Sequence, residues 1–508
     1  MRRSALGASL NLAVLIALAL PAVSEACVMA SRLRAIAPHL TEEQIMKIAH
    51  DPTHGELIPY KLDAPEACTD GMADIFPCDN VDLLAFLSPA DLGGNRGNDL
   101  WAWTDPQTGK EYALMGLTNG TAFIDVSTPE APIYLGRLPT HNGENSTWRD
   151  IAVYKDHAFI VADEVPTHGM QVFDLTQLRN IANPPVSFSA TLRYTELNDG
   201  HNITINEATG FAYVVGGVTC SGGPHIIDVR DPTAPVQVGC FSGDGYTHDL
   251  ECVTYDGPDT EHKGKEICLS SNEDTLTIID VTIKDRPVML SRTGYDNSGY
   301  IHQGSLTGDH RYFLIDDEAD ESIFNHNTRT YTFDVSDLDA PTLAGFYEAD
   351  GVAIDHNQYV MGDYVYQANY ARGLRILHLD DPSTGAMTEV AFLDTVPEGD
   401  MLGFSGAWSV YPYLSSGVVL ISDRNRGLFV VRPRIPGTTL FEDSFESGTT
   451  DGWRNRQDCI EDAEEAAPAA GEAPASSSPG QPSAAPSGDA PAVDSATSRP
   501  VTSSEAGE

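Results

Sequence analysis

Basic residues are scarce in this chain. Its 508 residues include 30 lysines and arginines against 74 aspartates and glutamates, so the formal net charge is −44. A surface this acidic repels phosphate backbones and anionic lipid headgroups. We therefore expect no nucleic-acid partner and no attachment to an anionic membrane surface. Two uses of the acidity stay open, namely the binding of cations and solubility in a salty exterior.

Several motifs of known chemistry are missing as well. The sequence has no Gly-X-Ser-X-Gly elbow and no HExxH pair, and its eight cysteines include no CxxC pair. The first two absences argue against two common kinds of hydrolase, and the third favours disulfides over a zinc site. Beyond residue 26 no segment has about 18 continuous apolar residues, so we expect no later transmembrane span.

The first 26 residues indicate export. Arg2 and Arg3 form a positive n-region, and an apolar stretch follows between Leu10 and Val23. Ser24-Glu25-Ala26 then places small residues at the −3 and −1 positions of a cleavage site, which is typical of a secretory signal peptide. We expect an extracellular, cell-surface or periplasmic protein whose first mature residue is Cys27. Lipidation of that cysteine stays an alternative.

An oxidising destination favours disulfide bonds. Two cysteines close a short loop before the repeats, and four others fall in consecutive predicted strands. We expect the pairs Cys68–Cys78, Cys252–Cys268 and, as the remainder, Cys220–Cys240.

The most informative feature that is present is an internal repeat of about 50 residues. Five short segments of the type Ile-Ile-Asp-Val recur, and a sixth carries His378 in place of the acid. The repeated aspartates are Asp125, Asp174, Asp228, Asp280 and Asp334. A period near 50 with short apolar strands predicts the blades of a β-propeller. We expect each aspartate to close the third strand of its blade and to cap the next turn.

The ends of the repeat region predict how the ring closes. The last repeat ends after its third strand, at Val431, and the segment Val81–Leu87 can supply the missing outer strand. Closing the ring with strands from both ends removes an open sheet edge. We therefore predict an all-β fold, a β-propeller of seven four-stranded blades, with six blades as the alternative.

Composition divides the chain into five parts. We expect a signal peptide over 1–26, an extension with a helix after Thr41 and a disulfide loop over 27–79, the propeller over 80–436, and a short linker or ordered patch over 437–459. Residues 460–508 contain no aromatic residue and are rich in Ala, Pro, Ser and acidic residues. Such a segment cannot bury enough surface to fold, so we predict a disordered acidic tail.

One face of the propeller is predicted to collect histidines and carboxylates. The start of the inner strand and the turn between the second and third strands lie on the same face of each blade, around the central channel. The candidate metal ligands are His201, His248, His302, His356, Asp249 and Glu251. Imidazole suits Zn, Cu, Fe and Ni, and carboxylates suit Ca, Mg and Mn. Alternatively, each histidine bonds to neighbouring backbone and caps its blade.

Other polar and aromatic residues of this face are candidates for ligand binding. They are Asp150, Asp316, Glu318, Trp408, Asp423 and Arg424. The sequence predicts no catalytic residue. The sequence leaves the cofactor open, with a divalent metal, either calcium or a transition metal, as the candidate.

The repeats and several short motifs resemble a known family. The Ile-Ile-Asp-Val segments and the Asp-x-x-x-Pro turns after them resemble the LVIVD repeat, and the wider pattern resembles the choice-of-anchor B family of exported bacterial propellers. The matching segments are 78–84, 200–202, 248–251, 301–304, 355–357 and 405–413. The resemblance spans about residues 66–433. It implies a propeller fold and export, and the family carries no established activity.

These features leave three hypotheses for function. The leading one is an exported, monomeric, non-catalytic propeller that acts as a binding or surface scaffold protein. Its partner would be an extracellular protein, a glycan or a small molecule that meets the histidine and carboxylate face. The alternative is a metal-dependent hydrolase of the lactonase or phytase-like propeller type, in which a metal in the channel activates water. The third is a purely structural surface protein.

Overall fold

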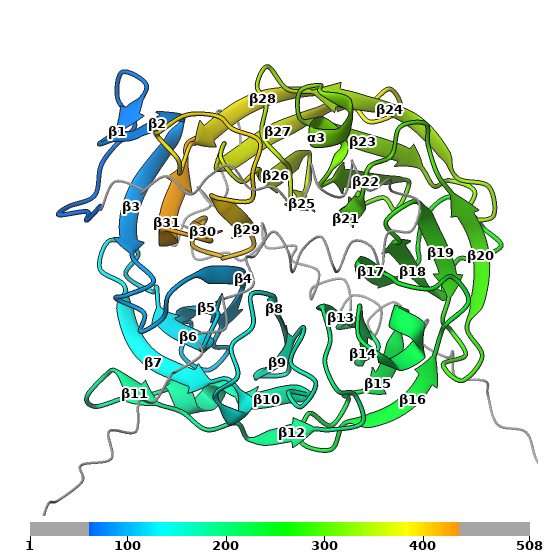
Figure 1. Cartoon of the computed structure of the whole chain (residues 1–508), viewed down its shortest axis with the longest axis horizontal. Helices are drawn as coiled ribbons and strands as arrows, with labels where there is room; N and C mark the ends of the chain where they lie inside the picture. Colours follow the sequence, from blue (N-terminus) through cyan, green and yellow to red (C-terminus); the bar gives the residue numbers. More distant parts are fainter. Residues whose placement is uncertain (1–59, 436–508) are drawn as a thin grey trace, which may run out of the picture. The chain divides into compact units, whose positions relative to one another are not determined.

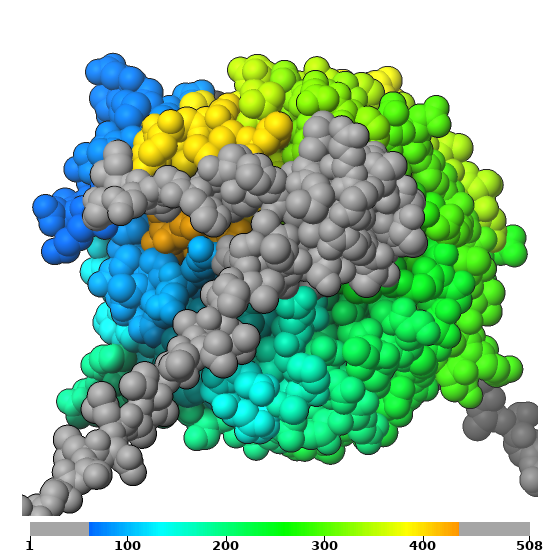
Figure 2. All heavy atoms as spheres, viewed as in Figure 1, coloured from blue at the N-terminus to red at the C-terminus, as the bar shows by residue number. Residues whose placement is uncertain are grey.

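The fold is a closed ring of seven antiparallel sheets around a central channel (Figure 1). The computed structural model describes residues 60–435, so the signal peptide, the helix expected after Thr41 and the acidic tail lie outside the described residues. In the space-filling view the colours follow one another around the ring, because successive blades are neighbours (Figure 2). The prediction of a seven-bladed propeller is confirmed.

Each blade has four strands, which are arranged in chain order from the channel to the outside of the ring, except that β3 is the outer strand of the last blade. The first three blades are β4 (Gly97–Thr104), β5 (Glu111–Leu117), β6 (Gly120–Asp125) and β7 (Ile133–Pro139); β8 (Arg149–Tyr154), β9 (His157–Ala162), β10 (Met170–Asp174) and β12 (Leu192–Tyr194); and β13 (Asn202–Asn206), β14 (Phe211–Val215), β15 (His225–Asp228) and β16 (Val236–Cys240). Blades four and five are β17 (Asp249–Thr254), β18 (Glu266–Ser271), β19 (Leu276–Asp280) and β20 (Val288–Thr293), and β21 (Ile301–Leu306), β22 (Tyr312–Asp317), β23 (Arg329–Asp334) and β24 (Thr342–Glu348). Blades six and seven are β25 (Asn357–Met361), β26 (Tyr364–Ala368), β27 (Leu374–Asp381) and β28 (Ala386–Leu393), and β29 (Ala407–Tyr411), β30 (Val419–Asp423), β31 (Gly427–Pro433) and β3 (Val81–Leu87).

The hydrophobic core lies between neighbouring blades. The second strand of a blade is covered on both faces, and all residues of β5 and of β22 are buried. Outer strands are more exposed, as in β16, where no residue is fully buried. Burial on both faces explains why the middle strands read as continuous apolar runs in the amino-acid sequence.

The repeated aspartates hold the turn after the third strand of each blade. In all five copies the Oδ1 atom accepts a hydrogen bond from the backbone N–H two residues later. The N···O distances are 3.1 Å at Asp125, 2.9 Å at Asp174, 3.0 Å at Asp228, 3.0 Å at Asp280 and 2.9 Å at Asp334. These are Asx turns, and the expected capping role is confirmed.

The ring closes with strands from the two ends of the described chain. Strand β3 pairs antiparallel with β31, in a register that places Val81 opposite Pro433 and Leu87 opposite Leu428. The outer strand of the seventh blade therefore comes from the N-terminal side, as the sequence predicts. The closure joins segments more than 340 residues apart and leaves no open edge between the first and last blades.

Two blades gain strands that the sequence did not predict. The short hairpin of β1 (Met72–Ala73) and β2 (Phe76–Asp79) pairs with β28, so the sheet of the sixth blade has six strands. Strand β11 (Val186–Ser187) adds to β7 in parallel. Both additions cover the exposed edge of an outer strand, which is a common way to block pairing with another chain.

Three disulfides lie within the described residues. They join Cys68 to Cys78, Cys220 to Cys240 and Cys252 to Cys268, which are the pairs that the sequence favours. The second bond lies in blade three, and the third links the paired strands β17 and β18 of blade four. Within residues 60–435 no helix has the length and apolar character to span a bilayer.

Asp394, after β28, is expected to make stability depend on pH. Its side chain accepts a hydrogen bond from the Val396 N–H at 2.8 Å, and burial raises its pKa to about 7. Because this folded-state pKa exceeds the unfolded value, the folded state binds more protons, and stability is lost as the pH rises toward 7. Asp394→Asn keeps the acceptor without the charge. The stability advantage of this variant should widen by about 2–3 kcal/mol between pH 5 and pH 8 in chemical unfolding. A constant difference would contradict the assignment.

Candidate functional site

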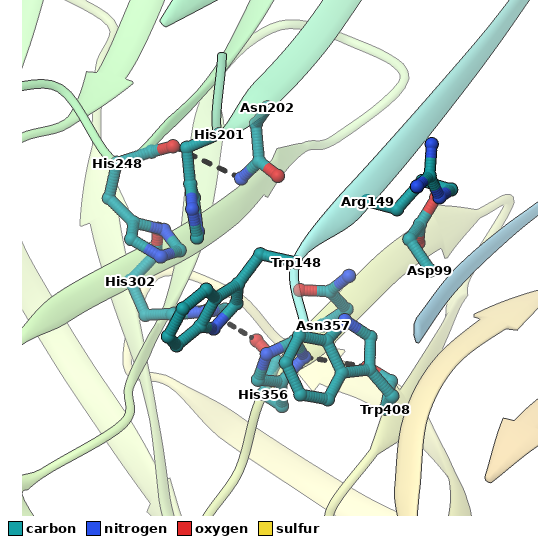
Figure 3. A pocket seen from close by; sticks show the side chains of 10 residues that line it. All are labelled: Asp99, Trp148, Arg149, His201, Asn202, His248, His302, His356, Asn357 and Trp408. Atoms are coloured by element: carbon teal, nitrogen blue, oxygen red, sulfur yellow. Dashed lines mark hydrogen bonds between the residues drawn. The ribbon is translucent and has the colours of Figure 1, made fainter. Parts of the chain in front are cut away.

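Four histidines form a continuous row along the channel. Each stands at the start of the inner strand of blades three to six, so consecutive rings come from consecutive blades. The ring centroids are 4.3 Å apart between His201 and His248, 4.1 Å between His248 and His302, and 4.2 Å between His302 and His356. Trp408 extends the row at 4.6 Å from His356 (Figure 3). The structure thus brings the four predicted histidines together.

Hydrogen bonds between blades fix the protonation of these rings. The Nδ1 atom of His248 donates to the carbonyl of His302 at 2.9 Å, His302 donates to the carbonyl of His356 at 2.9 Å, and His356 donates to the carbonyl of Trp408 at 2.6 Å. A carbonyl oxygen only accepts, so each Nδ1 carries a proton and each neutral ring keeps its lone pair on Nε2. This tautomer is the one that a metal-ligating histidine needs.

The first ring of the row is held differently. Its Nδ1 atom lies 2.9 Å from the Oδ2 atom of Asp163. A carboxylate in this position orients His201 as the carbonyls orient the other three rings. The turn between the second and third strands therefore does meet the start of the next inner strand, as the blade geometry predicts.

Glu318 faces two of the histidines. It follows β22, and its Oε2 atom lies 3.9 Å from Nε2 of His302, while Oε1 lies 3.7 Å from Nε2 of His356. The three side chains offer ligand atoms that all lie within 4.8 Å of one another. Separations of 3.7–3.9 Å are too long for hydrogen bonds. Two atoms at this separation can both bind one ion that lies between them, because zinc–nitrogen and zinc–oxygen bonds are about 2.0–2.2 Å long.

Burial sets the charges of these three groups. It lowers the pKa of His302 and His356 and raises the pKa of Glu318. Both imidazoles are therefore neutral at neutral pH, and the carboxyl has lost the solvation that favours its ionised form. A divalent cation between the three groups would reverse the effect on the carboxyl, since an adjacent positive charge stabilises the carboxylate.

Two neighbours hold Glu318 and His302 in place. The hydroxyl of Tyr370 donates to Oε1 of Glu318 at 2.8 Å. The Oδ1 atom of Asp316 lies 3.0 Å from Nδ1 of His302 and accepts the Gln303 N–H at 3.1 Å. The first contact orients the carboxylate of Glu318, and the second orients the ring of His302.

The space in front of the histidines is small. Its volume is about 10 Å³, which is room for about one water molecule, and Glu318 does not line it. It is lined by Asp99, Trp148, Arg149, His201, Asn202, His248, His302, His356, Asn357 and Trp408 (Figure 3). The two tryptophans stand at the ends of the histidine row and give the cavity apolar walls.

Several predicted site residues lie in contacts between or within blades instead. Asp150 accepts the Ile203 N–H of the next blade at 2.6 Å, and Glu251 accepts the Leu306 N–H at 2.8 Å. Asp249 accepts the backbone N–H of the residue that follows it at 2.7 Å. These three acids hold backbone groups, and none joins the cluster of His302, Glu318 and His356.

The last two predicted residues lie at the end of β30 (Asp423) and in the turn after it (Arg424). Asp423 accepts the N–H groups of Asn425 and Arg426 at 2.9 and 2.7 Å, so it shapes this turn. Arg424 donates to the carbonyl of Phe404 at 2.7 Å, and its guanidinium lies 5.7 Å from the ring centre of Trp408. Arg424 therefore supports one wall of the cavity through a cation–π contact.

Tyr370 and Trp148 are site residues that the sequence did not indicate. Tyr370 lies in the turn between β26 and β27 of blade six, and no repeat motif marks it. Trp148 precedes β8 and lines the cavity. No repeat motif marks it, because blades one and two do not carry the histidine.

A further histidine and carboxylate group lies away from the channel. His262 accepts a bond from Lys265 at Nδ1, at 3.0 Å, and its Nε2 atom lies 2.8 Å from Asp339. Asp259 completes this group. Both ring nitrogens are already bonded to protein atoms, so this imidazole has no lone pair to offer to a metal.

Comparisons with solved structures give distant likenesses. No protein-family model matches the sequence, and no curated protein matches it. A solved protein from Lactobacillus plantarum is 14% identical, with 65% of this chain and 89% of that chain covered and a TM-score of 0.46. Hydrazine synthase of Kuenenia stuttgartiensis is 13% identical, with 64% and 93% covered and a TM-score of 0.46. The β-propeller domain of Myceliophteria thermophila Cps50 (Swd1) is 12% identical, with 67% and 97% covered and a TM-score of 0.43.

Proposed function

We propose that this propeller binds a divalent transition-metal ion through His302, His356 and Glu318. The observation that carries the proposal is the meeting of two Nε2 lone pairs and one carboxylate within 4.8 Å. The Nδ1 atoms of both rings are held by backbone carbonyls, so the ligand atoms are oriented before any ion arrives. A structural role for the histidine row accounts for the Nδ1 bonds but not for the carboxylate of Glu318, which faces the Nε2 atoms of two rings.

The ligand set points to a class of metal. Two imidazoles and one carboxylate suit zinc and non-haem iron(II), whereas calcium and magnesium prefer oxygen ligands alone. Three protein ligands leave at least one position for water or a small ligand. We therefore assign zinc or iron(II) to this site and water to the remaining position.

Elemental analysis tests the proposal. The full chain, made without a metal-binding tag and purified from the exported fraction, should carry close to one zinc or iron ion per molecule. Chain that is purified without metal should bind added Zn²⁺ in calorimetry with the same stoichiometry. Absence of a transition metal together with no uptake of Zn²⁺ would overturn the proposal.

Tyr370→Phe is expected to lower the affinity for the metal without abolishing binding. The hydroxyl that donates to Glu318 orients the carboxylate, and such supporting contacts typically change metal affinity by about 10–100-fold. Competition for Zn²⁺ with a chelator of known affinity measures this loss. Since Phe fills nearly the same volume, the unfolding midpoint of the variant should stay close to that of the parent. Unchanged affinity would mean that this hydroxyl does not orient a metal-bound carboxylate.

A metal-dependent hydrolase is the second candidate function. The open coordination position supports it, because a bound metal can lower the pKa of its water and make a nucleophile. We rank it second because the cavity beside the histidines holds only about 10 Å³ and does not include Glu318 in its lining, so this cavity is not a substrate pocket at the proposed ion. Zinc-loaded chain offered lactones and phosphate monoesters should give no turnover. Turnover that is lost in Glu318→Gln would make the hydrolase the better assignment.

We further propose that the protein works outside the cytoplasm. Three disulfides support an oxidising compartment, and the pattern of residues 1–26 supports export by a signal peptide. We also propose that the domain limits are those expected from the sequence and that the partner is extracellular. The same proposal includes membership in the choice-of-anchor B group of LVIVD-repeat propellers. Mass spectrometry of the exported chain tests it, because the mature protein should begin at residue 27.

A further inference from the structure

Four aromatic side chains meet where the inner strands of three blades line the channel. Trp101 belongs to β4 of blade one, and Tyr359 belongs to β25 of blade six. Tyr411 ends β29 of blade seven, and Tyr413 follows two residues later. Each ring contacts two of the others, so the four rings form a closed cycle that joins blades six, seven and one. We call these four residues the aromatic cluster.

The contacts within this cycle are edge-to-face. The ring centre of Trp101 lies 5.1 Å from that of Tyr411 and 6.1 Å from that of Tyr359. Tyr413 closes the cycle at 5.4 Å from Tyr411 and 6.1 Å from Tyr359. The ring planes of the four pairs cross at angles between 70° and 84°. No pair stacks face to face, so the cluster does not use up its ring faces in parallel stacking.

The aromatic cluster is open to solvent. Tyr413 is 40% exposed, and the other three rings are half-buried. Rings that pack only between blades, such as Phe123, are fully buried. Groups of exposed aromatic and apolar side chains commonly mark sites that bind ligands or partners. A solute that enters the channel from this end can therefore touch the rings of the cluster.

Acidic side chains give this part of the channel a negative charge. Asp99 precedes Trp101 by two residues on β4, so both side chains leave the strand on the same face. Asp99 is 4% exposed, lines the channel cavity, and has no hydrogen-bond partner at Oδ1 (Figure 3). Burial and then the charge of Asp99 raise the pKa of Tyr359, and burial and then the charge of Glu207 raise the pKa of Tyr411. A ligand of the cluster is therefore expected to be positively charged.

We propose that the aromatic cluster binds an organic cation of the quaternary ammonium class. The face of an aromatic ring is electrostatically negative and attracts a cation that lies within about 6 Å of the ring centre. A fully methylated ammonium ion has no N–H to donate, so it needs no hydrogen-bond acceptor in its site. Its methyl groups match the apolar ring surfaces, and its charge matches the carboxylates beside them. Calcium and magnesium ions prefer oxygen ligands, which the rings do not provide.

The organic-cation site lies apart from the proposed metal site. Tyr359 comes three residues after His356, which corresponds to about 10 Å along an extended strand. The aromatic cluster therefore lies further along the channel than the row of histidines, and it shares no residue with the group of His302, Glu318 and His356. Binding of an organic cation does not depend on whether a transition metal binds, so the two proposals can fail separately.

Titration of the full chain with choline tests the inference. Calorimetry measures the affinity, and saturation-transfer NMR on the choline methyl groups reports direct contact. The neutral analogue of choline, in which a tert-butyl group replaces the trimethylammonium group, has the same shape without the charge. It should bind at least about 10-fold more weakly, because ring faces and carboxylates attract only the cation. Tyr413→Leu removes one exposed ring and should lower the affinity for choline by about 3–30-fold.

Three control variants should bind choline like the parent. Tyr413→Phe keeps the ring and loses only the hydroxyl that donates to the Val360 carbonyl at 3.2 Å. Phe346→Leu removes a ring of similar exposure, 44%, from the outer strand β24. His302→Ala alters the metal site alone. The inference would be overturned by an absence of binding up to about 10 mM choline, by equal affinities for choline and its neutral analogue, or by unchanged affinity in Tyr413→Leu.

Discussion

Replacing His302 or His356 with alanine is expected to lower the affinity for Zn²⁺ by more than about 100-fold. Each substitution removes one of three protein ligands, and even residues that only support a ligand typically change metal affinity by about 10–100-fold. The remaining imidazole and Glu318 would hold the ion as a weak two-ligand site. Metal content after dialysis should fall from close to one ion per chain to a small fraction of that.

His248→Ala is the matched control for this experiment. His248 stands in the same row, packs 4.1 Å from His302 between ring centres, and donates the same kind of Nδ1 bond to the next blade. It does not belong to the group within 4.8 Å of Glu318. We therefore expect the control to lose the same packing and backbone bond while it keeps the metal. Equal metal loss in His248→Ala and His302→Ala would mean that the whole row of histidines is needed to bind the metal.

Glu318→Gln separates charge from shape at the same site. The amide keeps an acceptor for the Tyr370 hydroxyl but brings no negative charge to the ion. We expect weaker Zn²⁺ binding than in the parent and an unfolding midpoint in the metal-free state that does not fall, because burial already disfavours the ionised carboxyl. Retained affinity in this variant would remove Glu318 from the ligand set.

The parts of the fold that the sequence predicts are those determined by local, repeated interactions. An aspartate that accepts from the N–H two residues later needs only its own turn, so the same pattern at Asp125 and Asp334 identifies two blades equally well. The pairing of β3 with β31 is also predictable, because a repeat that lacks its outer strand must find one. The hairpin β1–β2 has no such signal, since its partner β28 lies more than 300 residues away.

The candidate site is predictable only in part, for a related reason. Repeat positions identify the four histidines, because equivalent residues of successive blades face the same channel. Sequence does not tell which nitrogen of His248 or His302 carries the proton, since that depends on a carbonyl about 54 residues away in the next blade. It also does not distinguish Glu318, which faces the histidines, from Glu251, which holds a backbone N–H of the neighbouring blade.

The closure of the ring is expected to dominate stability. Phe429 of β31 is fully buried and packs edge-to-face against Phe86 of β3 at 4.9 Å and against Phe76 of β2 at 5.2 Å between ring centres. It therefore links the last blade to both segments from the N-terminal side. Phe429→Ala should lower the free energy of unfolding by about 3–5 kcal/mol, as measured in denaturant, because it leaves a cavity at the closure.

A comparison of two other phenylalanines tests whether the closure, and not phenylalanine loss in general, causes the effect. Phe346 of β24 is 44% exposed, so Phe346→Ala should cost less than about 1 kcal/mol. Phe86→Ala removes the partner ring, and a double-mutant cycle with Phe429→Ala should give a coupling of about 0.5–1.5 kcal/mol for the aromatic pair. Strictly additive effects would mean that the two ends stabilise the ring independently. A coupling in this range means that the N-terminal strand and the last blade form one cooperative unit, whose loss opens the ring on which the row of histidines depends.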